Sequence, residues 1–414
     1  MHRLTLLTLF GLSTILAACS QQKSPAGAAS PPTTVATQPV VIGMLAPITG
    51  VMAVHGESMQ MGVRVAEKVL NDQGGILGRP VRVVVLDTQS DPATAAQRAG
   101  ELIEKNKVVL LLGTGLSSET LAVIPISTRA HVPFIYSMDG EDKTCVAGDA
   151  DKVAEDVWGA GFTERMIVGP FLQYLGAHVL RNGLHSSIYF LGGDYVYPRV
   201  TNQFARATAE KMGFSTAGEE YVDIGTADYS PVIRRIMRSK ADLLLVTNPG
   251  SAAATFMRQA KQLGLDRSLA ISGFATFAQE AVGEMGSASE GVIYANRYTD
   301  LLQSPVNEAF VATFRAMYPG KPLLPGPTVA AGAYGAMLVA AKAFAAAHST
   351  GSEAFGKAMA GLSLELPQGT VEVDPANHVF HQHMYLLQVK DQKYHVLADL
   401  GSQSHPDFEG CSVH

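Results

Sequence analysis

Short apolar runs alternate with longer segments of helical periodicity from residue 40 onward. The run at 40–45 is apolar throughout, as in a buried strand, whereas 57–73 repeats its apolar residues at helical spacing and ends at Gly74 and Gly75. Strands that alternate with helices predict a parallel sheet. We expect further strands at 80–86, 108–112, 133–136, 186–190, 241–246 and 269–272, and further helices at 93–105, 118–130, 164–181, 199–212 and 251–263.

The C-terminal part adds helices at 306–317 and 329–347 and strand-like runs at 370–373 and 384–389. A length of 414 residues predicts about two globular units, at roughly 100–200 residues per domain. Hydrophobic residues make up 47% of the chain and charged residues 16%, a balance that excludes a disordered polymer. The sequence therefore predicts an α/β protein of two folded units.

The N-terminal segment differs in composition from the rest. Residues 1–18 have the pattern of an export signal, with Arg3 ahead of an apolar run that is too short to span a bilayer. The motif LAAC at 16–19 resembles a bacterial lipobox, in which Cys19 is diacylated and becomes the first residue of the mature chain; a chance cysteine is the alternative. Residues 19–39 predict a flexible linker, because large apolar side chains are scarce there. We expect a lipid tether rather than a transmembrane helix.

Charge and motifs exclude several functional classes. Lys and Arg number 31 against 37 Asp and Glu, and the basic residues are scattered, so we expect no nucleic-acid partner. The Gly-Thr-Gly run at 113–115 lacks the Gly-Lys-Ser/Thr of a phosphate-binding loop, and no Gly-x-Ser-x-Gly motif occurs. His378, His381 and His383 would fall on mixed faces of a strand, with no cysteine or carboxylate nearby to complete a metal site, which favours surface histidines. We expect no enzyme activity, no cofactor and no metal.

Turn and strand motifs then occur in a recognisable order. They are IGMLAPITG at 42–50, NDQGGILGRP at 71–80, GTGLSSET at 113–120, GDYVYPR at 193–199 and GTADYSP at 225–231. Together they closely resemble the leucine/isoleucine/valine-type periplasmic binding proteins, which feed ABC importers, and most of all the amide- and urea-binding branch. The resemblance implies a type I periplasmic binding protein, with two doubly wound lobes joined by three crossover segments and the ligand held between them. It assigns 40–160 plus 297–375 to lobe 1, and 161–296 plus 376–414 to lobe 2.

The resemblance also points to ligand-binding residues in lobe 1. Ser117 and Ser118 open a helix after a strand, where the family binds ligand oxygen; a plain N-cap is the alternative. His55 stands where the family places an aromatic residue at the cleft rim, or else is a solvated loop histidine. Asp139 follows a strand where relatives use a backbone carbonyl and a hydroxyl, and Gly140 replaces that hydroxyl. Asp139 could pair with a cationic ligand, or lie in a solvated acidic loop.

Lobe 2 holds three further candidate residues, two of which are indicated by the resemblance. Tyr195 matches a cleft tyrosine that packs on the ligand, and Asn248 follows a strand as a polar contact. Phe274 stands where amino-acid-binding relatives carry the glutamate that neutralises the ligand's ammonium group; a core position is the alternative. A buried ammonium without a carboxylate is costly. Unless Asp139 compensates, the position of Phe274 disfavours an amino acid and favours an amide, a urea-like compound or an aromatic or apolar solute.

The two cysteines left after lipidation, Cys145 and Cys411, predict one disulfide in an oxidising compartment. The resemblance therefore implies a lipid-anchored solute-binding protein of the periplasm or cell surface. It would capture a small amide, urea-like, branched-chain or aromatic solute by hinge closure and deliver it, as a monomer, to ABC permease subunits. The alternative is a ligand-sensing or regulatory lipoprotein of the same fold that acts on a receptor or an envelope enzyme.

Overall fold

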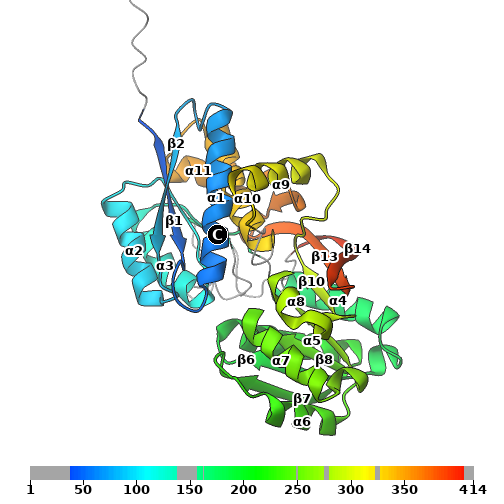
Figure 1. Cartoon of the computed structure of the whole chain (residues 1–414). Helices are drawn as coiled ribbons and strands as arrows, with labels where there is room; N and C mark the ends of the chain where they lie inside the picture. The colour runs from blue at the N-terminus through cyan, green and yellow to red at the C-terminus, as the bar shows by residue number, and fades with distance from the viewer. Residues whose placement is uncertain are drawn as a thin grey trace, which may run out of the picture. The chain divides into compact units, whose positions relative to one another are not determined.

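The computed structural model describes residues 38–137, 156–161, 163–248, 250–274, 279–321 and 327–404 (Figure 1). The first of its two sheets has the strand order β2-β1-β3-β4-β5, and every neighbouring pair is parallel. We call the part of the chain around this sheet lobe 1. Its elements are β1 Val40–Ala46, α1 Ala53–Asp72, β2 Val81–Asp87, α2 Pro92–Glu104, β3 Leu110–Leu112, α3 Ser117–Ala130, β4 Phe134–Tyr136 and β5 Val157–Gly159.

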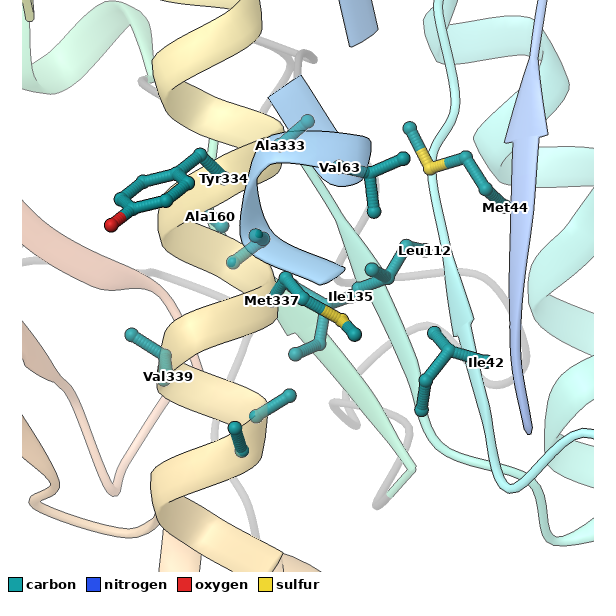
Figure 2. Packing of buried hydrophobic residues seen from close by; sticks show 14 of the residues in the cluster. Ile42, Met44, Val63, Leu112, Ile135, Ala160, Ala333, Tyr334, Met337 and Val339 are labelled. Carbon is teal, nitrogen blue, oxygen red and sulfur yellow. The ribbon is translucent and has the colours of Figure 1, made fainter. Parts of the chain in front are cut away.

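Helices cover both faces of the first sheet, because its strands are apolar on both sides. Ile42 and Met44 of β1 belong to a buried cluster with α1 and α10 (Pro327–Ala347), as Figure 2 shows. Leu45, the residue after Met44, belongs instead to a cluster with residues of α2 and α3. The continuous apolar run of β1 therefore reflects burial on two faces.

The second sheet has the order β11-β12-β13-β10-β9-β8-β6-β7, and β14 pairs with β13. The strands β10, β9, β8, β6 and β7 are parallel to their neighbours within this run, and we call the part of the chain around them lobe 2. Its elements are α4 Glu164–His178, β6 Ser187–Gly193, α5 Val196–Met212, β7 Ser215–Val222, α6 Ser230–Ser239, β8 Leu243–Thr247, α7 Gly250–Gln262, β9 Ala270–Phe274, α8 Gln279–Met285 and β10 Ile293–Asn296.

The C-terminal part returns to lobe 1 and then crosses again. It contains α9 Pro305–Met317, α10, α11 Ser352–Met359, β11 Ser363–Leu366, β12 Gly369–Val373, β13 Phe380–Lys390 and β14 Lys393–Gln403. Within α10, the stretch Val329–Ala347 is long and apolar enough to cross a membrane by length and composition. Because 78% of its most apolar window is buried inside the protein, it is a core helix of lobe 1.

The chain crosses between the two lobes after β5, after β10 and along β13, and these crossings meet at Ala160. Arg297, which follows β10, donates a hydrogen bond from Nη1 to the Ala160 carbonyl. Gln382 of β13 donates from Nε2 to the same carbonyl at 3.4 Å and to the Gly161 carbonyl at 2.7 Å. The expected two-lobed α/β fold with three crossovers is thus confirmed, while the predicted lobe boundaries stay a prediction.

Eight of the described α-helices and strands were not predicted: β5, β7, α6, α8, β10, α11, β11 and β14. β7 lies at one end of the sheet order, and its residues are exposed or half-buried, so the strand lacks the apolar run of a central strand. α6 buries only Val232, Ile233 and Ile236. An element that buries one narrow face gives a weak hydrophobic signal in the sequence.

Candidate functional site

The carboxyl ends of β3 and β4 are held side by side in lobe 1. Ser137, which follows β4, donates its backbone N–H to the Gly113 carbonyl at 3.0 Å, and Gly113 donates to the Ile135 carbonyl at 3.2 Å. The loop 113–116 then leads directly into α3. Because ligands of doubly wound sheets bind outside the carboxyl ends of the strands, this edge is the candidate site in lobe 1.

Ser117 and Ser118 are the first two residues of α3. Ser117 is buried and Ser118 half-buried. The N-cap is Leu116, not a serine, so the interpretation of Ser117 as a plain N-cap is wrong. The carbonyl of Leu116 accepts the N–H groups of Glu119 and Thr120 at 3.0 and 3.1 Å. A helix N-terminus attracts a negatively charged or carbonyl oxygen, and the ligand-binding role of both serines stays a prediction.

A buried carboxyl group holds the loop 113–116 in place. Glu119 is fully buried, and its Oε2 accepts the Gly115 N–H at 3.0 Å. Burial raises the pKa of Glu119. Gly115 itself leaves no room for a side chain, because a Cβ there would lie 2.4 Å from Cγ of Pro47. Sequence reasoning missed Glu119, since a glutamate in the first turn of a helix is usually solvated.

His55 lies in the first turn of α1 and is half-buried, so the alternative of a solvated loop histidine is wrong. Burial lowers the pKa of His55 to about 4, which leaves the imidazole neutral at physiological pH. The next residue, Gly56, fixes how closely α1 approaches the loop after β1: a Cβ there would lie 2.1 Å from the Pro47 carbonyl oxygen. His55 is thus held beside that loop, and its role at a cleft rim stays a prediction.

In lobe 2, Tyr195 and Asn248 follow β6 and β8. Tyr195 immediately precedes α5 and is half-buried, with its ring centroid 6.4 Å from that of Tyr197. Burial raises the pKa of the Tyr195 hydroxyl, so the ring stays neutral. Asn248 is buried and donates from Nδ2 to the Tyr229 hydroxyl at 3.4 Å, whereas its Oδ1 has no hydrogen-bond partner among the described residues. An acceptor of this kind could receive an N–H or O–H group of a ligand.

Hydrogen bonds between buried polar side chains of α4, α5 and β8 stabilise this edge of lobe 2. Thr247 donates to Oδ1 of Asn202 at 3.0 Å, and Thr201 donates to Oε1 of Glu164 at 3.1 Å. All four side chains are buried. The sequence signal for Thr201 and Asn202 was their place on the apolar face of α5, where polar residues need partners. Helix α5 also lies within contact distance of α3, the helix that begins at Ser117.

The exposure expected for Phe274 is not found. Phe274 is the last residue of β9 rather than a residue beyond the strand, and its side chain is fully buried. Its ring packs edge-on against Phe171 of α4, with centroids 5.1 Å apart, inside a hydrophobic cluster of lobe 2. The structure thus corrects the strand boundary and places Phe274 in the core, the alternative that the sequence left open.

Four predicted residues lie outside the described part of the chain. They are Asp139, the lipidation site Cys19, and the predicted disulfide partners Cys145 and Cys411. Their roles stay predictions.

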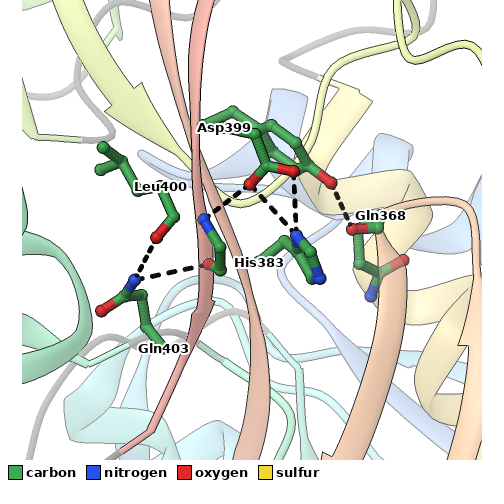
Figure 3. A network of polar contacts seen from close by, with 7 residues as sticks. Gln368, His383, Asp399, Leu400 and Gln403 are labelled. Atoms are coloured by element: carbon green, nitrogen blue, oxygen red, sulfur yellow. Dashed lines mark hydrogen bonds and ion pairs between the residues drawn. The ribbon is translucent and has the colours of Figure 1, made fainter.

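The histidine run of β13 and its preceding turn does not form a metal site in the described structure. No group of three or more His, Cys, Asp or Glu side chains among the described residues could hold a metal ion. His378 is not a surface residue as predicted: it is buried and stacks on Trp158 with centroids 5.1 Å apart. His381 is 3.0 Å from Asp374, and His383 is 3.1 Å from Asp399, as Figure 3 shows for the latter pair. His381 and His383 therefore each lie near one carboxylate, which the sequence analysis did not predict.

A cavity of about 400 Å³ lies at the opposite end of the lobe 2 sheet. Its lining includes Leu243 and Ala270 at the starts of β8 and β9, together with Lys261 and Glu290. None of the predicted ligand residues lines it. Because ligands of this fold class bind at the carboxyl ends of strands, we do not assign the solute site to this cavity.

Comparison with known proteins agrees with the two-lobed α/β architecture. The chain matches the periplasmic binding protein family over residues 39–393. It is 28% identical over 365 residues to Leu/Ile/Val-binding protein homolog 6 of Brucella melitensis, covering 84% of this chain and 87% of that protein. It is 24% identical over 340 residues to the leucine-, isoleucine-, valine-, threonine- and alanine-binding protein of Pseudomonas aeruginosa, covering 82% and 87%.

Two solved structures share the fold. A solute-binding protein of an ABC transporter from Rhodopseudomonas palustris HaA2, in complex with p-hydroxybenzoic acid, superposes with a TM-score of 0.80 at 21% identity, covering 89% of this chain and 98% of that one. A leucine-binding protein from Thermotoga maritima superposes with a TM-score of 0.76 at 22% identity, covering 87% and 98%. At these identities the likeness establishes the architecture alone.

Proposed function

The chain belongs to the periplasmic binding proteins of the Leu/Ile/Val-binding type, a family of extracytoplasmic solute-binding proteins rather than enzymes, and on this premise we propose its function. It captures one small solute between its lobes by hinge closure and delivers it to the permease subunits of an ABC importer, without catalysis. Closure follows binding because the closed form contacts the solute from both sides and therefore binds it more tightly.

The observation that carries the proposal is the start of α3. Ser117 is buried at the carboxyl edge of the lobe 1 sheet, yet it is not the N-cap of its helix. The loop that precedes Ser117 is held by the Glu119 carboxylate, which accepts its Gly115 N–H group. A rigid loop that presents a hydroxyl and a helix N-terminus fits the capture of a ligand oxygen.

The charges of the groups at the carboxyl edges of the lobe 1 and lobe 2 sheets indicate which class of solute would bind. Phe274 is apolar and buried, Glu119 is occupied by the loop backbone, and His55 is neutral at physiological pH. None of these groups would neutralise an α-ammonium group. We therefore favour an amide, urea-like, branched-chain or aromatic solute without an ammonium group, with Asp139 as the residue that would reverse this preference. The amide- and urea-binding branch remains part of the proposal.

Cellular placement is also part of the proposal. Cys19 carries the lipid anchor, residues 19–39 form the tether, and the folded part works as a monomer in the periplasm or at the cell surface. Residues 1–18 would be removed, and Cys145 and Cys411 would form one disulfide. A Cys19→Ala variant that stays in the membrane fraction after a high-salt wash would contradict the anchor.

A thermal-shift screen over amides, ureas, amino acids and aromatic acids, followed by calorimetry, tests the proposal. A solute at 100 times its Kd adds about 2.7 kcal/mol to the free energy of unfolding, a shift that such a screen resolves. Mass spectrometry of the incubated hits should return them unchanged at one equivalent per chain. Turnover of a hit, or no stabilisation by any compound, would contradict a solute-binding role.

A further inference from the structure

Arg297 is a fully buried guanidinium at the crossing that follows β10; its side chain is 1% exposed. Its Nη2 donates to the Ser137 carbonyl at 2.6 Å, and its Nη1 donates to the Ala160 carbonyl. These carbonyls directly follow β4 and β5. Arg297 therefore lies at the carboxyl edge of the lobe 1 sheet, the edge that holds the loop before α3.

The charge of Arg297 has no counter-charge among the described residues. Its guanidinium donates to the backbone carbonyls of Ser137 and Ala160, no carboxylate of the described residues forms an ion pair with it, and its Nε has no hydrogen-bond partner among those residues. Burial lowers the pKa of Arg297 to about 10, so the group remains a cation at neutral pH. A buried charge without a counter-charge is costly, and its field is poorly screened at this depth.

Other features of the same edge also favour negative charge. Ser137 links the Arg297 guanidinium to the loop before α3, because its carbonyl accepts from Arg297 and its N–H donates to Gly113. The hydroxyl of Ser137 is buried and has no hydrogen-bond partner among the described residues. The N-terminus of α3 adds a positive end of a helix dipole to this edge. A cation, an unused hydroxyl and a helix N-terminus thus belong to one continuous stretch of hydrogen-bonded structure.

We propose that the solute is a small organic anion, a carboxylate without an ammonium group, whose charge balances Arg297. This inference rests on the proposed function and narrows its range of solutes to the branched-chain and aromatic acids, so that the amides and urea-like compounds drop out. The anion is received at the start of α3 by Ser117 and the helix N–H groups, and Arg297 acts on it through the local electrostatic field. Arg297 is thereby a specificity-determining residue, positioned by Ser137 and Ala160, and it selects the acid over the corresponding neutral amide.

The test compares acids with their amides by calorimetry on the full chain. The probe pairs are benzoate with benzamide, 4-methylpentanoate with 4-methylpentanamide, and the acid and amide forms of the tightest hit from the screen. We expect the wild type to bind the acid at least about tenfold more tightly than the amide. Equal binding, or preference for the amide, would overturn the inference while leaving solute capture intact. Failure of every compound to bind would contradict the proposed function itself.

Variants separate the charge of Arg297 from its structural role. Arg297→Met should bring the acid-to-amide affinity ratio close to one and leave the amide affinity within about threefold, whereas Arg297→Lys should keep a ratio above about fivefold. Gln382→Met is the matched control, because Gln382 donates to the same Ala160 carbonyl but carries no charge. It should change acid and amide affinities equally and preserve their ratio. A ratio that survives in folded Arg297→Met would refute the role of Arg297; if that variant does not fold, the wild-type and Arg297→Lys ratios decide.

Discussion

The carboxyl edges of the two lobes differ in the kind of group that they offer. The lobe 1 edge combines serine hydroxyls, a helix N-terminus and the buried cation Arg297. The lobe 2 edge offers neutral groups, the Tyr195 ring and the amide of Asn248. Such a division suits a solute with one charged end and one neutral body. Lobe 1 would fix and select the charged end of the solute, and lobe 2 would recognise its neutral remainder.

The largest expected effect tests whether Phe274 belongs to the lobe 2 edge or to its core. Phe274→Ala should lower the free energy of unfolding by about 3–5 kcal/mol, because the ring is fully buried against Phe171 and its removal leaves a cavity. Urea unfolding followed by circular dichroism measures the loss. Val196→Ala, at a position 39% exposed at the start of α5, is the control and should cost less than about 0.5 kcal/mol. Near-wild-type stability combined with a tenfold loss of solute affinity would instead place Phe274 in contact with the solute.

The second effect tests whether His55 adds a positive charge to the lobe 1 edge. Because the folded-state pKa of His55 is lowered from 6.5 to about 4, the unfolded chain binds a proton in this window that the folded chain does not. The free energy of unfolding should therefore fall as the pH falls from 6.5 to about 4. The full shift corresponds to about 3 kcal/mol, which partial exposure of the ring reduces to about 1–2 kcal/mol.

Denaturation of wild type and His55→Gln across that pH range isolates the contribution of His55, since all other groups titrate in both proteins. The variant should lose less stability on acidification. Identical pH profiles, or an NMR titration of His55 near pH 6.5, would mean that the ring becomes positively charged. The lobe 1 edge would then hold a second positive charge beside that of Arg297.

The sequence predicted the framework of both lobes better than it predicted their edges. Central strands such as β1 and β8 are apolar on both faces, so their signal is strong, and the strand-to-helix junction pointed directly to Ser117. Arg297 and Glu119 could not be found in this way. A charged residue is exposed by default, and its burial depends on carbonyl and N–H partners that only the folded chain brings together. Phe274 shows the reverse error, because an apolar residue at a strand end fits an edge or a core equally well.

The third effect concerns the proposed hydrogen bond from Ser117 of lobe 1 to the solute. Ser117→Ala should weaken solute binding by about 0.5–1.5 kcal/mol and leave stability nearly unchanged, because the hydroxyl does not cap α3. Ser127→Ala is a matched control on the same helix: its hydroxyl donates to the Val132 carbonyl at 2.9 Å, so the variant should lose stability and keep affinity. Calorimetry and urea unfolding of both variants measure the contrast. An unchanged Kd for Ser117→Ala would remove the serine from the solute site.

The smallest effect, the one expected for Tyr195→Phe, tests the neutral character of the lobe 2 edge. If the ring packs on the body of the solute, Tyr195→Phe should change affinity by less than about 0.5 kcal/mol, because it keeps the aromatic face and removes only a hydroxyl. Tyr195→Ala should cost about 1–2 kcal/mol of binding, since apolar contact area is lost, and should weaken acid and amide equally. Calorimetry with the acid and amide pairs measures both changes. If Tyr195→Phe weakens the affinity for the acid but not for the amide, the hydroxyl binds the charged end of the solute. The assignment of the charged end to lobe 1 and the neutral body to lobe 2 would then be wrong.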